Sequence, residues 1–218
     1  MKKLALACIG VLITMSVLSM PALAGEKVVK RVPAGAAAFH FVADLTFATG
    51  ELVGYVAFIE GVDGDMNDDL FDGPPSKDTA YFTVRLTKPT PAPTFLPVET
   101  GSGLVVLLFQ PAGAEATVFF DDTPGPRDWS IPDTFSEGVP IAVLEESALL
   151  NTASAGAAFN VFSSRLIDSA PIDFYGQRID FKKLVPNGVT ITNFSSPRAG
   201  GGSFGATAFA IGGNLRDK

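Results

Sequence analysis

The stretch "FHFVADLTF", Phe39 to Phe47, decides the fold class. Its apolar residues occupy every second position, and the polar residues His40, Asp44 and Thr46 fall between them. Successive side chains of a β-strand point to opposite faces, so this alternation predicts a strand with one buried face. The same pattern recurs in "TAYFTVRL" (79–86), "EATVFFDD" (115–122) and "VTITNFS" (189–195).

Other runs are apolar at consecutive positions, which predicts strands covered on both sides or strands around an apolar interior. They are "LVGYVAFIE" (52–60), "GLVVLLFQ" (103–110) and "GATAFAIG" (205–212). Short turn sequences such as "YGQ" (175–177) and "PNG" (186–188) separate the runs. Only 142–158 could form a helix of useful length, and it reads equally well as a strand and a loop.

These patterns predict an all-β fold of about ten to twelve strands, with at most one short helix, in an antiparallel β-barrel or β-sandwich. We expect a single domain over residues 25–218. The proline-rich segment "LTKPTPAPTFLPVETGSG" (86–103) is expected to form a surface crossover near 88–100 or a proline-blunted sheet edge, rather than a linker between domains.

The first 24 residues have the pattern of a cleaved signal peptide. Lys2 and Lys3 precede an apolar run from Leu4 to Met20, and Ala22-Leu23-Ala24 supplies the small residues of a cleavage site. We therefore expect export to the periplasm or the extracellular space. Cleavage would remove the only cysteine, Cys8, so no disulfide or thiolate chemistry is expected in the mature chain.

Charge limits the expected partners. Cleavage would leave 14 basic and 23 acidic residues, a net charge of −9. A negative surface disfavours nucleic acid, whereas cations, neutral glycans and apolar ligands remain compatible. No integral membrane segment is expected after cleavage, and a membrane β-barrel is disfavoured because phenylalanine, at 18 residues, far outnumbers the interfacial aromatics tyrosine and tryptophan. The oligomeric state is left open.

The segment "GVDGDMNDDLFDGPP" (61–75) concentrates acidic residues. Oxygen ligands at alternate positions of a loop can converge on Ca²⁺, and a shorter loop than the EF-hand could be closed by a final acid. The EF-hand pattern itself fails, because Asp68 and Pro74 stand where it needs glycine and a bidentate acid. A solvated acidic loop is the alternative to a calcium site. The candidate metal ligands are Asp63, Asp65, Asn67, Asp69 and Asp72.

Catalytic chemistry has little support in the sequence, and no catalytic residue is predicted. The single histidine, His40, lies on the polar face of its strand and is expected to be a surface residue. Carboxylates do cluster between 121 and 146 around Trp129, and paired acids such as Asp122 and Asp133 could serve a hydrolase. Trp129 is instead expected to attach a long loop to the core.

The sequence therefore favours an exported, non-enzymatic β protein that binds a ligand or plays a structural part. A barrel holding an apolar small molecule is the first hypothesis, because several strands are apolar on both faces. A Ca²⁺-stabilised surface or matrix module is the alternative, and a carboxylate hydrolase is the third. A glycan is a further partner compatible with the charge.

Overall fold

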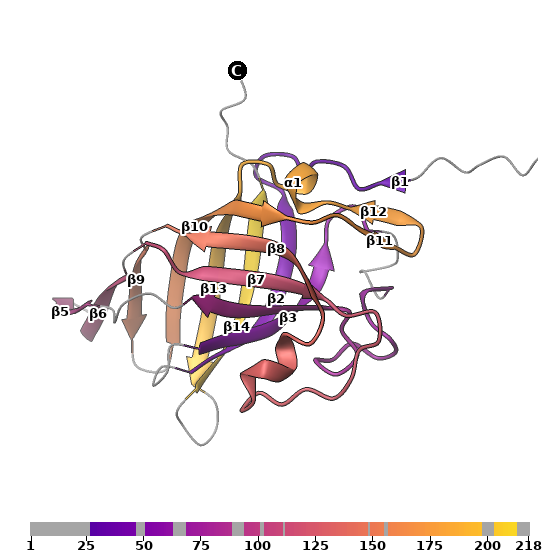
Figure 1. Ribbon diagram of the computed structural model, residues 1–218. Coiled ribbons are helices and arrows are strands. Elements are labelled where there is room, and N and C mark those ends of the chain that lie inside the picture. The colour runs from indigo at the N-terminus through magenta and orange to yellow at the C-terminus, as the bar shows by residue number, and fades with distance from the viewer. Residues whose placement is uncertain are drawn as a thin grey trace, which may run out of the picture.

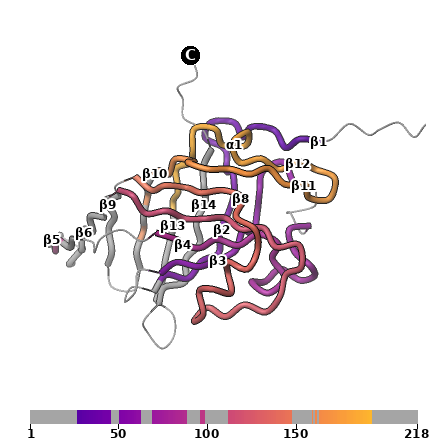
Figure 2. Tube along the Cα trace, viewed as in Figure 1, coloured from indigo at the N-terminus to yellow at the C-terminus, as the bar shows by residue number. Residues whose placement is uncertain are grey.

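The computed structural model describes residues 27–46, 51–62, 69–88, 94–100, 103–110, 112–147, 149–154, 157–197 and 203–212 (Figures 1 and 2). Within these ranges it contains fourteen β-strands, one 3₁₀ turn and one helix of four residues. The predicted all-β, mainly antiparallel fold is confirmed. The predicted signal peptide lies outside the described residues.

Eight strands pair in a closed ring, which makes the structure a β-barrel rather than a sandwich. Their order is β13-β14-β2-β3-β4-β7-β8-β10, and pairing of β10 with β13 closes the ring. Every pairing in the ring is antiparallel. The strands are β2 (Ala37–Thr46), β3 (Glu51–Ile59), β4 (Phe82–Lys88), β7 (Glu115–Phe120), β8 (Val139–Glu146), β10 (Ala157–Ser169), β13 (Val189–Pro197) and β14 (Ser203–Gly212).

Strand register aligns the apolar positions on the inner face of the ring. Val84 of β4, Val118 of β7 and Ala142 of β8 lie opposite one another on successive strands, and all three are buried. On β2, Phe39 and Phe41 belong to the same buried core and contact each other at a ring-centroid distance of 5.0 Å. An eight-stranded barrel is just wide enough for side chains to fill it or for one small ligand to enter.

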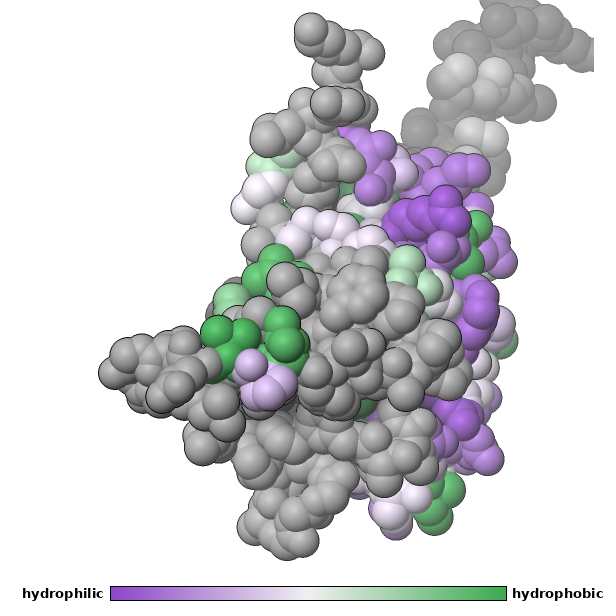
Figure 3. Space-filling view, turned by 90° about the vertical axis from the view of Figure 1, so that its left-hand side faces the viewer, coloured by the Kyte–Doolittle hydropathy of each residue, from purple (hydrophilic) through white to green (hydrophobic). Residues whose placement is uncertain are grey.

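A three-stranded extension leaves the ring at β10. Residues 157–159 of β10 pair with β9 (Leu149–Ser154), which continues to β6 (Gly103–Gln110) and to the edge strand β5 (Thr94–Thr100). The proline-rich segment thus supplies an edge strand that contains Pro97, one of the two predicted outcomes. Figure 3 shows a small cluster of apolar side chains on this side of the molecule. Among the large apolar residues, Leu96 of β5 and Phe159 and Val161 of β10 are 59%, 52% and 47% exposed.

A cap covers the barrel at the top of Figure 1. It consists of β1 (Lys27–Val28), β11 (Ile172–Phe174), β12 (Gln177–Ile179) and α1 (Phe181–Leu184). Asp180 begins α1 by accepting a hydrogen bond from the backbone N–H of Lys182. Phe181 lies 5.8 Å from Phe39 between ring centroids, so the apolar side of the cap joins the core of the barrel.

The long loop 121–138 covers the outer face of β3 and β4. Its 3₁₀ turn η2 (Pro132–Phe135) contacts both strands, and the Thr83 hydroxyl donates to the Phe135 carbonyl at 2.7 Å. Trp129 packs against Phe135 at 5.0 Å and against Tyr55 of β3 at 6.4 Å. These contacts agree with the predicted attachment of the loop by Trp129.

The segment 142–158, which could have been a helix, divides among β8, β9 and the start of β10 in its described residues. The only helix in the described part of the chain is α1, in a segment where none was predicted. No helix among the described residues has the length and the apolar character needed to cross a membrane.

Candidate functional site

The predicted calcium loop lies largely outside the described residues, which exclude Asp63, Asp65 and Asn67. Asp69 and Asp72 are described and exposed, and the Asp72 backbone N–H donates to the Thr79 carbonyl at 2.7 Å. Within the ranges given above, no three His, Cys, Asp or Glu side chains gather as metal ligands. The calcium site therefore stays a prediction.

The carboxylates around Trp129 hold structural contacts. Asp133, 86% exposed, pairs with Arg85 at 2.6 Å, and Asp128 accepts hydrogen bonds from the backbone and hydroxyl of Ser130. These hydrogen bonds lower the pKa of Asp128. Asp133 therefore links the loop 121–138 to β4, and Asp128 stabilises a turn within that loop.

Asp121 makes a more buried contact in the same loop. It pairs with Arg127 at 3.0 Å, and the Arg127 side chain is only 2% exposed. Burial lowers the pKa of Arg127, and the nearby Asp121 opposes that effect. Arg127 also donates to the carbonyl of Lys77, so this network joins the loop 121–138 to the segment after the acidic loop.

His40 was expected at the surface and is half-buried instead. Burial lowers the pKa of its imidazole. The expectation was wrong because the outer face of a barrel strand is not necessarily open to solvent.

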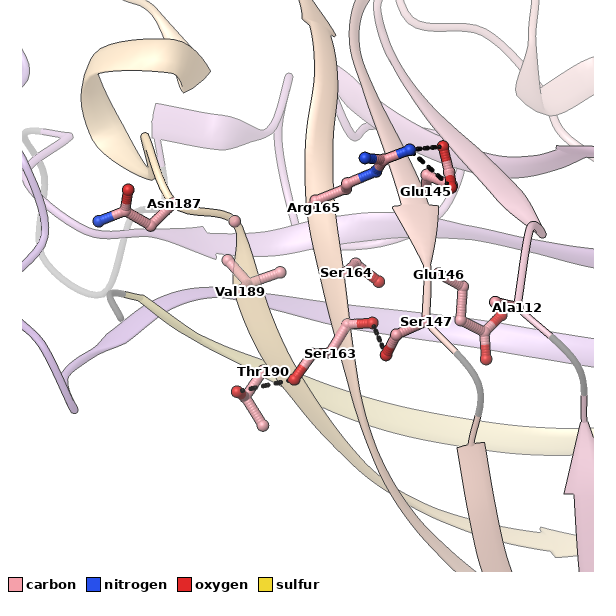
Figure 4. Close-up of a pocket in the computed structure, with 11 residues that line it drawn as sticks. Ala112, Glu145, Glu146, Ser147, Ser163, Ser164, Arg165, Asn187, Val189 and Thr190 are labelled. Atoms are coloured by element: carbon pink, nitrogen blue, oxygen red, sulfur yellow. Dashed lines mark hydrogen bonds and ion pairs between the residues drawn. The ribbon is translucent and has the colours of Figure 1, made fainter. Parts of the chain in front are cut away.

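A cavity of about 340 Å³ lies where β8, β10 and the start of β13 meet (Figure 4). Most of the side chains around it carry a charge, a hydroxyl or an amide. Its lining residues are Ala112, Glu145, Glu146, Ser147, Ser163, Ser164, Arg165, Asn187, Gly188, Val189 and Thr190.

Strand register determines which of these side chains face the barrel interior. Glu146 of β8 lies opposite Ser164 of β10, and Ser164 lies opposite Val189 of β13. Glu146 is two residues beyond Leu144, a core residue, and side chains two apart on a strand share a face. Glu146 and Ser164 therefore belong to the inner face of the barrel wall.

The neighbouring positions face outward and satisfy one another. Arg165 donates two hydrogen bonds to the Glu145 carboxylate, at 2.8 and 3.0 Å. The Ser163 hydroxyl lies 3.5 Å from the Thr190 hydroxyl. In Figure 4 dashed lines join Arg165 to Glu145, and none reaches the Glu146 carboxylate.

Two inner polar groups lack a partner in the described part of the chain. No hydrogen bond or ion pair joins the Glu146 carboxyl or the Ser164 hydroxyl to another described residue, although Ser164 is only 5% exposed. Burial raises the pKa of Glu146 from its ordinary 4.5 to about 7. The polar side-chain atoms of Glu146 and Ser164 are not fully enclosed, so a ligand or ordered water in the cavity can reach them.

Gly188, one of the lining residues, allows the chain to approach β10 closely beside the cavity. Its φ is +80°, and a Cβ at this position would lie 2.1 Å from the Ser164 carbonyl oxygen. Any residue with a side chain would push β13 away from β10. The "PNG" turn (186–188), which contains Gly188, connects α1 to β13. A short hairpin-type connection between two strands was predicted there instead.

Sequence reasoning had placed Glu145 and Glu146 only in a broad group of carboxylates. One signal was available: two consecutive acids at the end of an alternating strand must face opposite sides, so one of them faces the core. Ser164 and the role of Gly188 depend on pairings between distant strands and were missed.

Comparison with protein-family models, with curated proteins and with solved structures finds no match to this chain.

Proposed function

We propose that this protein is a non-enzymatic binding module that holds a small polar molecule in the cavity between β8, β10 and β13. The observation that carries the proposal is the pair of inner-face polar groups, Glu146 and Ser164, which have no hydrogen-bond partner among the described residues. A ligand that bonds to both would give each group the hydrogen bond that it lacks among the described residues.

The cavity has a size and a lining that suit such a ligand. Sites for small molecules in proteins usually have about 300–1,000 Å³ and a few placed polar groups, and this cavity has about 340 Å³. A polar ligand replaces the apolar one expected from the two-sided strands. Aromatic rings of Phe39, Phe41 and Phe181 already fill the interior next to the cap.

Export and the Ca²⁺-stabilised acidic loop remain separate predictions that are compatible with a binding module. A hydrolase is not proposed, because Asp133, Asp121 and Asp128 are engaged with Arg85, Arg127 and Ser130, and Asp122 accepts a hydrogen bond from Thr123.

The test is a nuclear magnetic resonance titration of the full chain with small polyols, amines and amino acids. We expect at least one class to give saturable shifts in the backbone amides of Glu146, Ser164 and Val189, and Ser164→Ala to weaken that response. Shifts absent from these three amides for every class, or spread over the surface without saturation, would refute the proposal.

A further inference from the structure

We infer that the ligand of this cavity is a small molecule with one primary ammonium group, bound between the Glu146 carboxylate of β8 and the Ser164 hydroxyl of β10. The inference rests on the proposed function, and it names the chemical class of the ligand. It follows from the charge balance, the hydrogen-bonding capacity and the burial of the cavity walls.

The charge balance leaves one negative charge for a ligand. Three ionisable residues line the cavity, and two of them, Glu145 and Arg165, face outward and neutralise each other through two hydrogen bonds, which leaves Glu146 as the ionisable residue of the inner face. On the next strand, Glu115 lies opposite Glu145 and pairs with Lys88 at 2.7 Å. Glu146 is the carboxylate of the cavity without a cation among the described residues, so a monocation fits and an anion is repelled.

Hydrogen-bonding capacity favours a primary amine over other cations. An ionised carboxylate only accepts hydrogen bonds, and a serine hydroxyl can also accept. An ammonium group has three donors and no acceptor, so it can satisfy Glu146 and its cross-strand neighbour Ser164 together. A quaternary ammonium has no such donor and is usually held by aromatic faces, of which the described lining has none.

Burial makes this pairing selective. The partly desolvated Glu146 is hard to ionise, as its raised pKa indicates, and an ammonium ion beside it restores the charged form. Hydrogen bonds to a charged group are strong enough to change affinity about tenfold or more. A neutral ligand of the same shape gains no such term.

The experiment compares two probes that differ in one group, 4-amino-1-butanol and 1,4-butanediol, by calorimetric titration of the full chain at pH 8. We expect the amine to bind about tenfold more tightly than the diol. Glu146→Gln should reduce the amine to the affinity of the diol, whereas Asp173→Asn, an equal charge change at an exposed position of β11, should leave the preference intact. At pH 5.5, where Glu146 is protonated, the preference should disappear.

Each alternative result has a defined meaning. Equal affinities for amine and diol in the unmodified protein, with both weakened by Ser164→Ala, would overturn the inference and leave the proposed function standing. An amine preference that survives Glu146→Gln would also overturn it, since another group would then hold the charge. Failure of both probes to bind at millimolar concentration, or displacement of the amine by equimolar Na⁺ or Ca²⁺, would count against an ammonium site.

Discussion

Replacement of Glu146 by glutamine should make the protein more stable at pH 8 and should change its stability little at pH 5. Burial raises the pKa of this carboxyl to about 7, whereas the same group titrates near 4.5 in the unfolded chain. Between these two values the folded state binds more protons than the unfolded state, so stability falls as pH rises. Glutamine keeps the shape and removes the titration.

The size of the effect follows from the two pKa values. Each pH unit between them corresponds to about 1.4 kcal/mol, so the shift sets an upper limit of about 3 kcal/mol. Glu146 is half-buried, and solvent screening reduces the expected loss to about 2 kcal/mol. For a domain of this length, that loss lowers the melting temperature by about 4–8 °C.

The assay is thermal unfolding of the full chain at pH 5 and pH 8, without ligand, for the unmodified protein and two variants. Glu145→Gln is the matched control, because it removes the adjacent carboxylate, which faces outward and is paired with Arg165. We expect its melting temperature to follow that of the unmodified protein between the two pH values. The difference between Glu146→Gln and the unmodified protein should appear at pH 8 only.

Parallel melting curves for Glu146→Gln and the unmodified protein across this range would refute the reasoning. They would mean that the carboxyl is well solvated, and the same result would remove the burial argument for an ammonium ligand.

Three further predictions concern other parts of the molecule. Tyr175→Phe should lower the pKa of Tyr81 from about 12 toward 10, because the hydrogen bond between the two hydroxyls is the main cause of the raised value. The pKa can be measured from the ultraviolet absorbance of tyrosinate. An unchanged titration would contradict the contact between the two hydroxyls. Gly188→Ala should lower the free energy of unfolding by about 3 kcal/mol, as measured by urea unfolding, since its Cβ would collide with the Ser164 carbonyl. Gly73→Ala, which has open space around its Cβ, should lower it by about 1 kcal/mol. Equal losses for the two variants would argue against the close contact at Gly188. Millimolar Ca²⁺ should raise the melting temperature, and Asp65→Ala should abolish that rise. A melting temperature that does not change with Ca²⁺ would contradict the predicted calcium site.

Most of the strands could be predicted because their signal is local. The alternation in 39–47 became β2, and the patterns at 79–86 and 189–195 became β4 and β13 within a few residues. The helix α1 was not predicted, because a four-residue helix has too few residues to establish a periodic pattern. The half-burial of His40 was also missed, since covering an outer face depends on distant segments.

The candidate site was predictable only in part. Glu145 and Glu146 fell within the carboxylate cluster of 121–146, but nothing in their own segment says which of them faces the interior. The pairing of Leu144 with Leu166 sets that choice, and a shift of one residue would exchange the two carboxylates. The partner of Glu146 across the strands, Ser164, is eighteen positions away and carries no motif.

By itself, the sequence determined that the chain forms strands with apolar faces. The alternation of side chains between the two faces of a strand depends only on neighbouring residues, so it can be recognised in a short segment. Only the tertiary structure decided that eight strands close through β10 and β13, and that Glu146 turns inward beside Ser164. Ring closure and register depend on hydrogen bonds between strands far apart in the chain. These hydrogen bonds form only when all strands of the sheet are paired together, so no single segment of the sequence specifies them.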